Sequence, residues 1–148
     1  MSTLQFQILA VAVWGFWAGC LGLALRRGDR PVRLFAATAL TFFLLARIAR
    51  WLWHGPAVWS TWADAAILVP MLAIALRWPR RWLVWACAFQ LATVATYVAH
   101  ALDRSIGALA YATAVNLWGV LGQCALLYGT FEADRWRRAR RGTLVGVP

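Results

Sequence analysis

Two arginines and a histidine share one face of a long apolar segment, and they are the strongest candidates for chemistry in this chain. Arg47, Arg50 and His54 stand at i, i+3 and i+7, a spacing that puts them on one side of a helix. A charge at the centre of a membrane helix costs about 2.5 to 3.5 kcal/mol, so such residues are candidates for function. Because guanidinium groups bind phosphates and carboxylates, we expect Arg47 and Arg50 to bind an anionic lipid or partner group, or to pair with acids.

Two acids are expected at the same membrane face as these arginines. Asp64 and Asp103 come from other segments of the chain, but the predicted topology brings both to this side, together with His100. They would complete a binding site or a buried ionic network. The other interpretation is that the arginines near a helix end extend along their flexible stems to the interface. The sequence leaves both interpretations open.

The two histidines raise the question of a cofactor. His54 and His100 are expected at similar depth on two helices, and neutral imidazoles so placed can ligate a b-type haem. Both stand at the extreme edge of their spans, where interfacial histidines are common, and we therefore predict neither a cofactor nor a metal site. The cysteines lack CxxC and CxxCH spacing and are interpreted as small core residues: Cys20, Cys87 and Cys124.

Two further sets of polar side chains recur at helical spacing within apolar segments. A polar stripe in lipid must face protein or water, so it either lines a path or joins helices. Interhelical hydrogen bonds contribute about 1 kcal/mol each, and we favour this structural interpretation over transport. The first stripe is Gln90, Thr93, Tyr97 and His100, and the second is Asn116, Gly119 and Gln123.

Catalytic patterns are missing from the sequence. It has no paired inward carboxylates, no nucleophile with a base at suitable spacing and no phosphate-binding glycine loop. We therefore predict that the protein is not an enzyme.

Apolar segments must position all of these residues. The 148 residues are 63% apolar and have a mean hydropathy of +0.64, whereas soluble domains are apolar over about half of their residues. Segments of about 20 apolar residues cross a bilayer as helices. The predicted fold is all-α, a polytopic membrane bundle in residues 1–131, followed by a basic cytoplasmic tail in 132–148. Its five transmembrane helices are predicted at about 4–25, 34–53, 61–76, 82–101 and 106–131. Pro70 predicts a kink in the third.

The arginines predict the orientation of this bundle. The chain has a net charge of +10 from 15 basic residues, all arginine. Arg47, Arg50 and Arg104 lie toward one side, and the other 12 occupy two turns and the tail on the opposite side. Since basic loops stay in the cytoplasm, we expect a bacterial inner-membrane protein with a periplasmic N-terminus and a cytoplasmic C-terminus.

The tail combines arginines with Trp136, and we expect it to lie on the anionic leaflet. Each arginine near such a surface contributes about 1 kcal/mol, so membrane lipids are the expected partners and nucleic acid is not. The tail residues expected to bind lipid or a partner are Arg135, Arg137 and Arg138.

Three stretches of the chain carry a resemblance. The run Ala86-Cys87-Ala88-Phe89-Gln90-Leu91, the run His100-Ala101-Leu102-Asp103 and the run Ala110-Tyr111-Ala112-Thr113-Ala114 are similar to a group of uncharacterised small membrane proteins from sphingomonad-type bacteria. The similarity covers about the last third of the chain. It implies a location in the bacterial inner membrane and no activity.

These observations favour an integral inner-membrane accessory or scaffold subunit that packs against other membrane proteins and lipids. Gly15, Gly19 and Gly22 form a small-xxx-small pattern, which permits close packing on a neighbouring helix or a second copy. The alternative is a small oligomeric transporter or channel, and a carrier of haem or pigment comes third.

Overall fold

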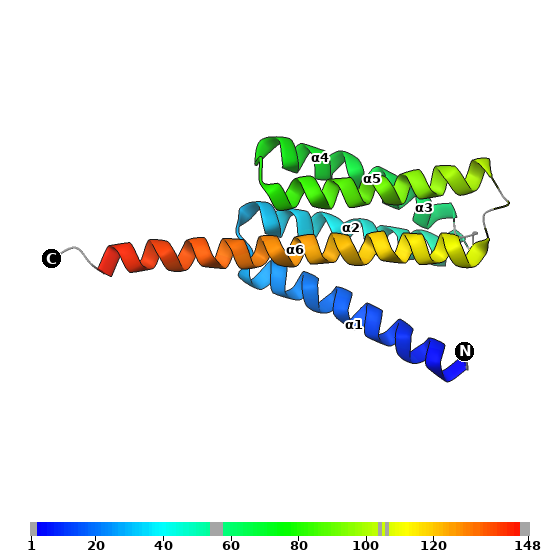
Figure 1. The fold of residues 1–148 in the computed structure, drawn as a ribbon, viewed down its shortest axis with the longest axis horizontal. Helices are drawn as coiled ribbons and strands as arrows, with labels where there is room; N and C mark the ends of the chain where they lie inside the picture. The colour runs from blue at the N-terminus through cyan, green and yellow to red at the C-terminus, as the bar shows by residue number, and fades with distance from the viewer. Residues whose placement is uncertain (1–2, 54–57, 104, 106, 146–148) are drawn as a thin grey trace.

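The protein is a bundle of antiparallel α-helices, seen in a computed structural model that describes residues 3–53, 58–103, 105 and 107–145 (Figure 1). Across these residues there is no β-strand, which confirms the all-α prediction. The helices are, in chain order, α1 (Thr3–Arg27), α2 (Arg30–Trp53), α3 (Val58–Ala66), α4 (Leu68–Arg77), α5 (Arg81–Leu102) and α6 (Ala108–Val145).

Three of the described helices contain a segment long and apolar enough to cross a membrane. These segments are Arg30–Ala49, Arg81–Leu102 and Leu109–Ala139. They lie in α2, α5 and α6, so the three are fewer than the five predicted transmembrane helices. Length and composition therefore support a membrane protein with three candidate spans.

The helix predicted at 61–76 is interrupted, which confirms the predicted kink. It is divided at Ile67 into α3 and α4. Pro70 has no N–H group, so the carbonyl of Ala66 loses the partner that a regular helix would give it. Helical hydrogen bonds are present on both sides of the break. The Ile67 N–H donates to the Ala63 carbonyl over 3.0 Å, and the Met71 N–H donates to the Ile67 carbonyl over 3.1 Å.

Tight packing is concentrated in one half of the bundle, which we call the basic half because the arginine-rich turns lie at its end. Trp82 of α5 is at its centre with none of its surface exposed. The Trp82 ring meets the Phe35 ring edge to face at 5.5 Å and lies against Gly129, where a Cβ atom would come within 2.5 Å of it. The other buried core residues include Leu21, Ala24, Val32, Ala36, Met71, Leu83, Ala86 and Leu126.

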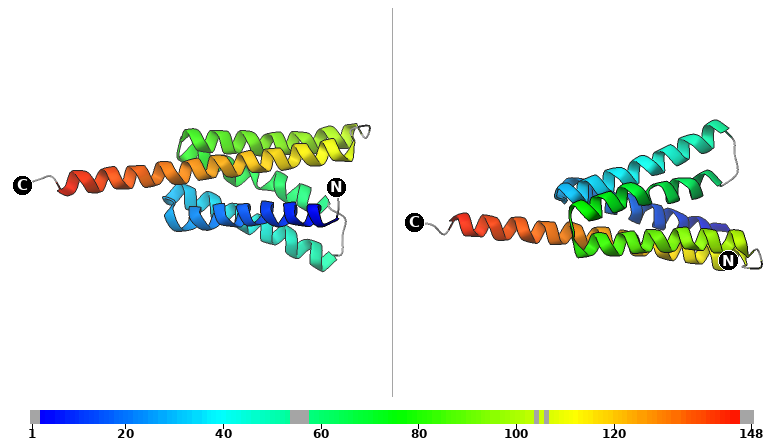
Figure 2. Two further views of the ribbon diagram at one scale, coloured as in Figure 1. Left: turned by 60° about the horizontal axis from the view of Figure 1, so that its bottom comes forward. Right: turned by 90° about the horizontal axis from the view of Figure 1, so that it is seen from above.

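The opposite half, which we call the far half, is open. Helix α1 diverges from α6 toward its N-terminus (Figure 1), and α2 diverges from α5 and α6 in the same direction (Figure 2). Among the described side chains of this half, only Thr93 is buried. The far half comprises residues 11–19, 41–52, 62–66, 88–103 and 107–123.

Helix α6 runs past the rest of the bundle at the basic end (Figure 1). The helix predicted at 106–131 therefore continues through most of the tail predicted at 132–148, as far as Val145. Arginine and alanine are good helix formers, so the basic segment extends the helix instead of ending it.

Candidate functional site

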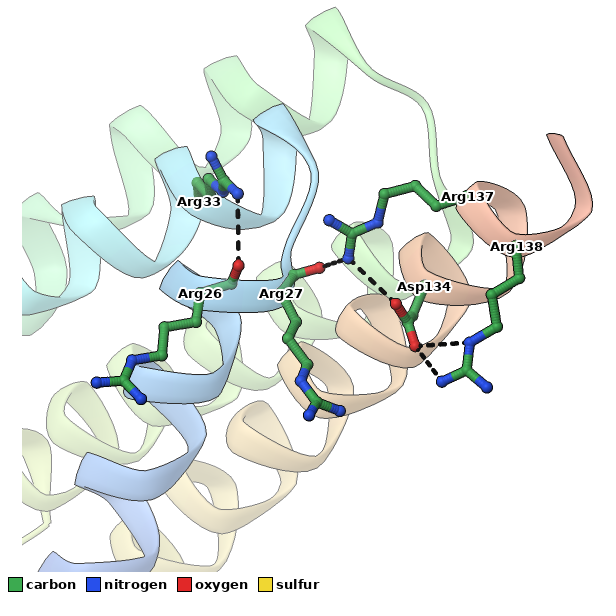
Figure 3. Close-up of polar contacts among 6 residues, drawn as sticks. All are labelled: Arg26, Arg27, Arg33, Asp134, Arg137 and Arg138. Carbon is green, nitrogen blue, oxygen red and sulfur yellow. Dashed lines mark hydrogen bonds and ion pairs between the residues drawn. The ribbon is translucent and has the colours of Figure 1, made fainter. Parts of the chain in front are cut away.

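The basic end joins three segments that are far apart in the sequence. Asp29, in the turn between α1 and α2, forms an ion pair of 2.9 Å with Arg80, in the turn between α4 and α5. Arg137 of α6 donates a hydrogen bond to the backbone carbonyl of Arg27 (Figure 3). The two basic turns and the basic part of α6 therefore lie together, as the distribution of arginines predicted.

A cavity of about 240 Å³ lies between the end of α1 and the basic part of α6. Asp134 is its single carboxylate: it accepts hydrogen bonds from Arg138 over 2.7 and 3.2 Å and from Arg137 over 3.4 Å (Figure 3). Four arginines and one carboxylate line the cavity, so the site has an excess of positive charge, while the Arg26 and Arg27 side chains extend away from Asp134 (Figure 3). It suits an anion such as a phosphate group. The lining residues are Arg26, Arg27, Asp134, Arg137 and Arg138.

Two arginine side chains donate hydrogen bonds to the last carbonyls of helix α1. The last carbonyls of a helix have no partner within it, and they need donors from elsewhere. Arg33 of α2 donates to the Arg26 carbonyl over 3.4 Å, and Arg137 supplies the donor for Arg27. Gly28 leaves room for this close turn, because a Cβ there would collide with the Ala24 carbonyl and the Val32 side chain.

A second polar group lies in the far half, between α3 and α5. The Tyr97 hydroxyl donates a hydrogen bond of 2.5 Å to the Asp64 carboxylate. Gln90, two turns along α5, donates its side-chain N–H to the backbone carbonyl of Asp64 over 2.7 Å. Two residues of one α5 face therefore hold the end of α3 at its side chain and at its backbone.

Two rings extend this cluster toward α6. His100 stacks on Tyr111 with ring centroids 4.3 Å apart, and the Tyr97 and Tyr111 rings are 6.0 Å apart. Within the described part of the chain, the buried Nδ1 atom of His100 has no hydrogen-bond partner. We refer to Asp64, Tyr97, His100 and Tyr111 as the Asp64 cluster.

The predicted arginine face is only partly visible. Arg47 is exposed on α2, while His54 and the side chain of Arg50 lie outside the described residues. The structure pairs Asp64 with Tyr97, whereas the sequence suggested an arginine partner. The haem ligation considered for His54 and His100 stays untested, because His54 lies outside the described residues.

Asp103 makes a local turn. Its carboxylate accepts a hydrogen bond from the Ser105 N–H over 2.8 Å, and hydrogen bonding to Ser105 holds the pKa of Asp103 below its usual value. The side chain is exposed at the end of the bundle. It therefore orders the turn between α5 and α6 and lies outside the Asp64 cluster.

The predicted polar stripes differ in their use. On α5, the stripe residues Gln90 and Tyr97 bond to Asp64 of α3. Thr96, which lies outside the predicted stripe, accepts a hydrogen bond of 3.2 Å from the Trp118 indole N–H of α6. On α6, Asn116 is exposed, and the buried Gln123 Oε1 has no partner among the described residues. The α5 stripe joins helices, as favoured from the sequence, while the α6 stripe is only partly satisfied.

Sequence reasoning missed Tyr111, Trp118 and Asp134, and it did not assign Arg26 and Arg27 of the first basic turn to a binding site. Tyr111 and Trp118 are aromatic residues in an apolar helix, and no spacing rule marks them as partners of α5. Asp134 carried a usable signal, because an acid at i with arginines at i+3 and i+4 forms ion pairs on a helix. The tail arginines Arg137 and Arg138 form those pairs, while Arg135 is exposed.

The fold of the described residues defines the class of protein: an all-α bundle in which three helices are long and apolar enough to cross a membrane. Among the described residues there is no group of three or more histidine, cysteine, aspartate or glutamate side chains that could hold a metal ion. Comparison of the chain with protein families, with curated proteins and with solved structures found no match.

Proposed function

We propose that this protein is an integral inner-membrane accessory or scaffold subunit that packs against other membrane proteins and lipids. In this proposal the chain crosses a bacterial inner membrane five times, through α1, α2, the α3–α4 pair, α5 and α6. The 25 residues of α1 extend over about 37 Å at roughly 1.5 Å per residue, enough for a hydrocarbon core of about 30 Å. The basic end then faces the cytoplasm, with the N-terminus in the periplasm.

The observation that carries this proposal is the contrast between the two halves. The basic half has a packed core, while the far half presents large apolar side chains on diverging helices. Exposed aromatic rings are abundant in protein interfaces, where their rigid area packs at little entropic cost. In the far half the exposed tryptophans include Trp51 (76% exposed) and Trp62 (66%). A partner protein in the membrane would close this half.

The basic end supports the lipid part of the proposal. Arg26, Arg27, Arg137 and Arg138 surround the cavity described above, and they would meet the headgroups of the cytoplasmic leaflet. Anionic headgroups bind basic clusters at this position by about 1 kcal/mol per charge. The proposed role of these arginines is to hold the bundle at a fixed depth and orientation.

Co-purification with matched tryptophan variants tests the proposal. The full chain is extracted from native membranes in mild detergent, and the complex is sized and its components are identified. Trp51→Ala with Trp62→Ala removes two exposed rings from the far half. Trp85→Ala is the control, because this tryptophan of the basic half is exposed to a similar degree, 61%.

We expect a stoichiometric membrane protein that the far-half variant loses and the control variant retains. A clean monomer or homo-oligomer from wild-type membranes would contradict the accessory role. Equal loss in both variants would contradict the assignment of the interface to the far half.

The alternative is a small oligomeric transporter or channel, and one observation favours it. Gln123 carries a buried oxygen without a partner among the described residues, and Asn116 on the same stripe is exposed. In an oligomer such amides could line a shared path. Gln123→Leu should then abolish ion or solute flux in proteoliposomes, while Thr113→Val should not, because its hydroxyl donates to its own helix at the Leu109 carbonyl. Absence of flux in the wild type removes this alternative.

A further inference from the structure

The Asp64 carboxyl group is partly buried between α3 and α5, and it is held at a fixed place. Tyr97 donates to its side chain over 2.5 Å, and Gln90 donates to its backbone over 2.7 Å. Removal from water favours the neutral acid, whereas a hydrogen bond from a hydroxyl favours the anion. These opposing effects allow the group to exist in either protonation state at one site.

The surroundings of Asp64 leave this charge without a cationic partner among the described side chains. On the elements packed near α3, the titratable groups are Tyr97 and His100 of α5 and Tyr111 of α6. The basic residue of α4, Arg77, lies in that helix's last turn at the basic end. On α2, Arg47 is exposed and forms no ion pair with Asp64. Arg50's side chain and His54 lie outside the described part of the chain.

His100 is the second independent sign of proton chemistry at this place. Its Nδ1 atom is buried and, within the described residues, has no hydrogen-bond partner. A buried polar atom without a partner is costly, so such a nitrogen is available for a proton or a water molecule. An acid, a phenol pair and an imidazole therefore meet near one end of the bundle, in reach of the aqueous face.

We propose that Asp64 and Tyr97 form a proton-binding site that exchanges protons with the aqueous phase at the far end of the bundle. On uptake, one proton adds to a carboxylate oxygen of Asp64, and the anion becomes a neutral acid. The neutral acid then donates a hydrogen bond to the Tyr97 oxygen. The contact between the two groups persists, but Asp64 is now the donor and Tyr97 the acceptor. This site goes beyond the accessory role and does not depend on it.

A hydrophobic carbodiimide, dicyclohexylcarbodiimide, tests the site because it reacts with protonated carboxyl groups in apolar surroundings. The acid adds across one C=N bond: its oxygen binds the central carbon and its proton goes to a nitrogen. The O-acylisourea then rearranges to a stable N-acylurea on the same carboxyl. The full chain in vesicles of phosphatidylethanolamine and phosphatidylglycerol is treated from about pH 5 to about pH 9, and the label is mapped by peptide mass spectrometry.

We expect a label on Asp64 that decreases as the pH rises, and no label on Asp134, which two arginines keep ionised. Asp64→Asn should remove the label. Tyr97→Phe should move the midpoint upward by about one to two pH units, because a hydrogen bond to the anion is lost. Tyr128→Phe, on an exposed residue of α6, is the matched control and should leave the midpoint unchanged.

Three results would overturn the proposal. They are an unlabelled Asp64 at every pH, a label that does not vary with pH, and an unchanged profile in Tyr97→Phe. Mapping on the wild-type chain needs no substitution, so a variant that fails to fold cannot imitate the first two results.

Discussion

Replacing Gly129 with alanine should disturb the centre of the packed half. A Cβ built on Gly129 would lie 2.5 to 2.8 Å from three atoms of the Trp82 indole, whereas carbon atoms in contact normally lie about 3.5 to 4.0 Å apart. The indole has no exposed surface and also contacts the Phe35 ring, with ring centroids 5.5 Å apart. It can move only if α5 and α6 separate or the core repacks.

The magnitude follows from two opposing effects. Excess volume in a packed core typically costs about 1 to 3 kcal/mol. Replacing glycine by alanine within a helix returns about 0.8 to 1 kcal/mol. Gly122→Ala on the same helix isolates the second effect, because a Cβ at Gly122 meets nothing within 4 Å. The difference between the two variants is therefore the packing cost alone, about 1 to 3 kcal/mol.

Unfolding in detergent micelles measures this difference. The purified variants are titrated with a denaturing detergent, and the loss of helix is followed by circular dichroism. Gly129→Ala should unfold at lower denaturant than the wild type, and Gly122→Ala at the same or higher denaturant. Equal free energies of unfolding for the two variants, within about 0.5 kcal/mol, would refute the close contact between Trp82 and α6.

Three further predictions concern the helix break and the basic end. Pro70→Ala gives the Ala66 carbonyl a donor and should slow amide hydrogen exchange at residues 67–71; unchanged exchange would show that another contact sets the break. Asp134→Asn removes the single carboxylate of the arginine cavity. The loss of one negative charge should strengthen the binding of phosphatidylglycerol by about 1 kcal/mol, so that about fivefold more of this lipid is retained after extraction. Equal retention in wild type and variant argues against a lipid site. Arg137→Lys keeps the charge, but lysine cannot bridge Arg27 and Asp134 as a planar guanidinium does. Amide hydrogen exchange at the end of α1 should therefore accelerate. An exchange rate equal to that of the wild type would contradict this prediction.

The sequence was sufficient for the helices, because a long apolar run has few alternatives to a helix. Pro70 predicted the break in the third helix, and the arginine-rich turns predicted which helix ends lie together, as the Asp29–Arg80 ion pair confirms. The end of α6 was missed, since the helix was predicted to end at 131, whereas the good helix formers of the tail extend it to Val145. The resemblance carried by residues 86–114 stays a prediction.

The side-chain partners could not be predicted to the same degree. Asp64 and Tyr97 are 33 residues apart in the chain, and their meeting depends on how α3 is oriented relative to α4 across the break at Ile67. A pattern along one helix shows which residues share a face, but not which face of another helix it meets. The contact of Trp82 with Gly129 is of the same kind. Gly15, Gly19 and Gly22 were predicted to permit close packing on a neighbouring helix or a second copy. A Cβ at any of them meets nothing within 4 Å, so among the described residues no helix of the chain packs closely on them, and contact with a second copy stays a prediction.

Photo-crosslinking in native membranes tests most directly whether the far half is a protein interface. A photoreactive amino acid replaces Trp51 or Trp62 in the far half, or Trp85 in the basic half, and the full chain is irradiated before extraction. The proposed function predicts a discrete crosslinked membrane protein from positions 51 and 62, and lipid adducts alone from position 85. Lipid adducts alone from all three positions would contradict it.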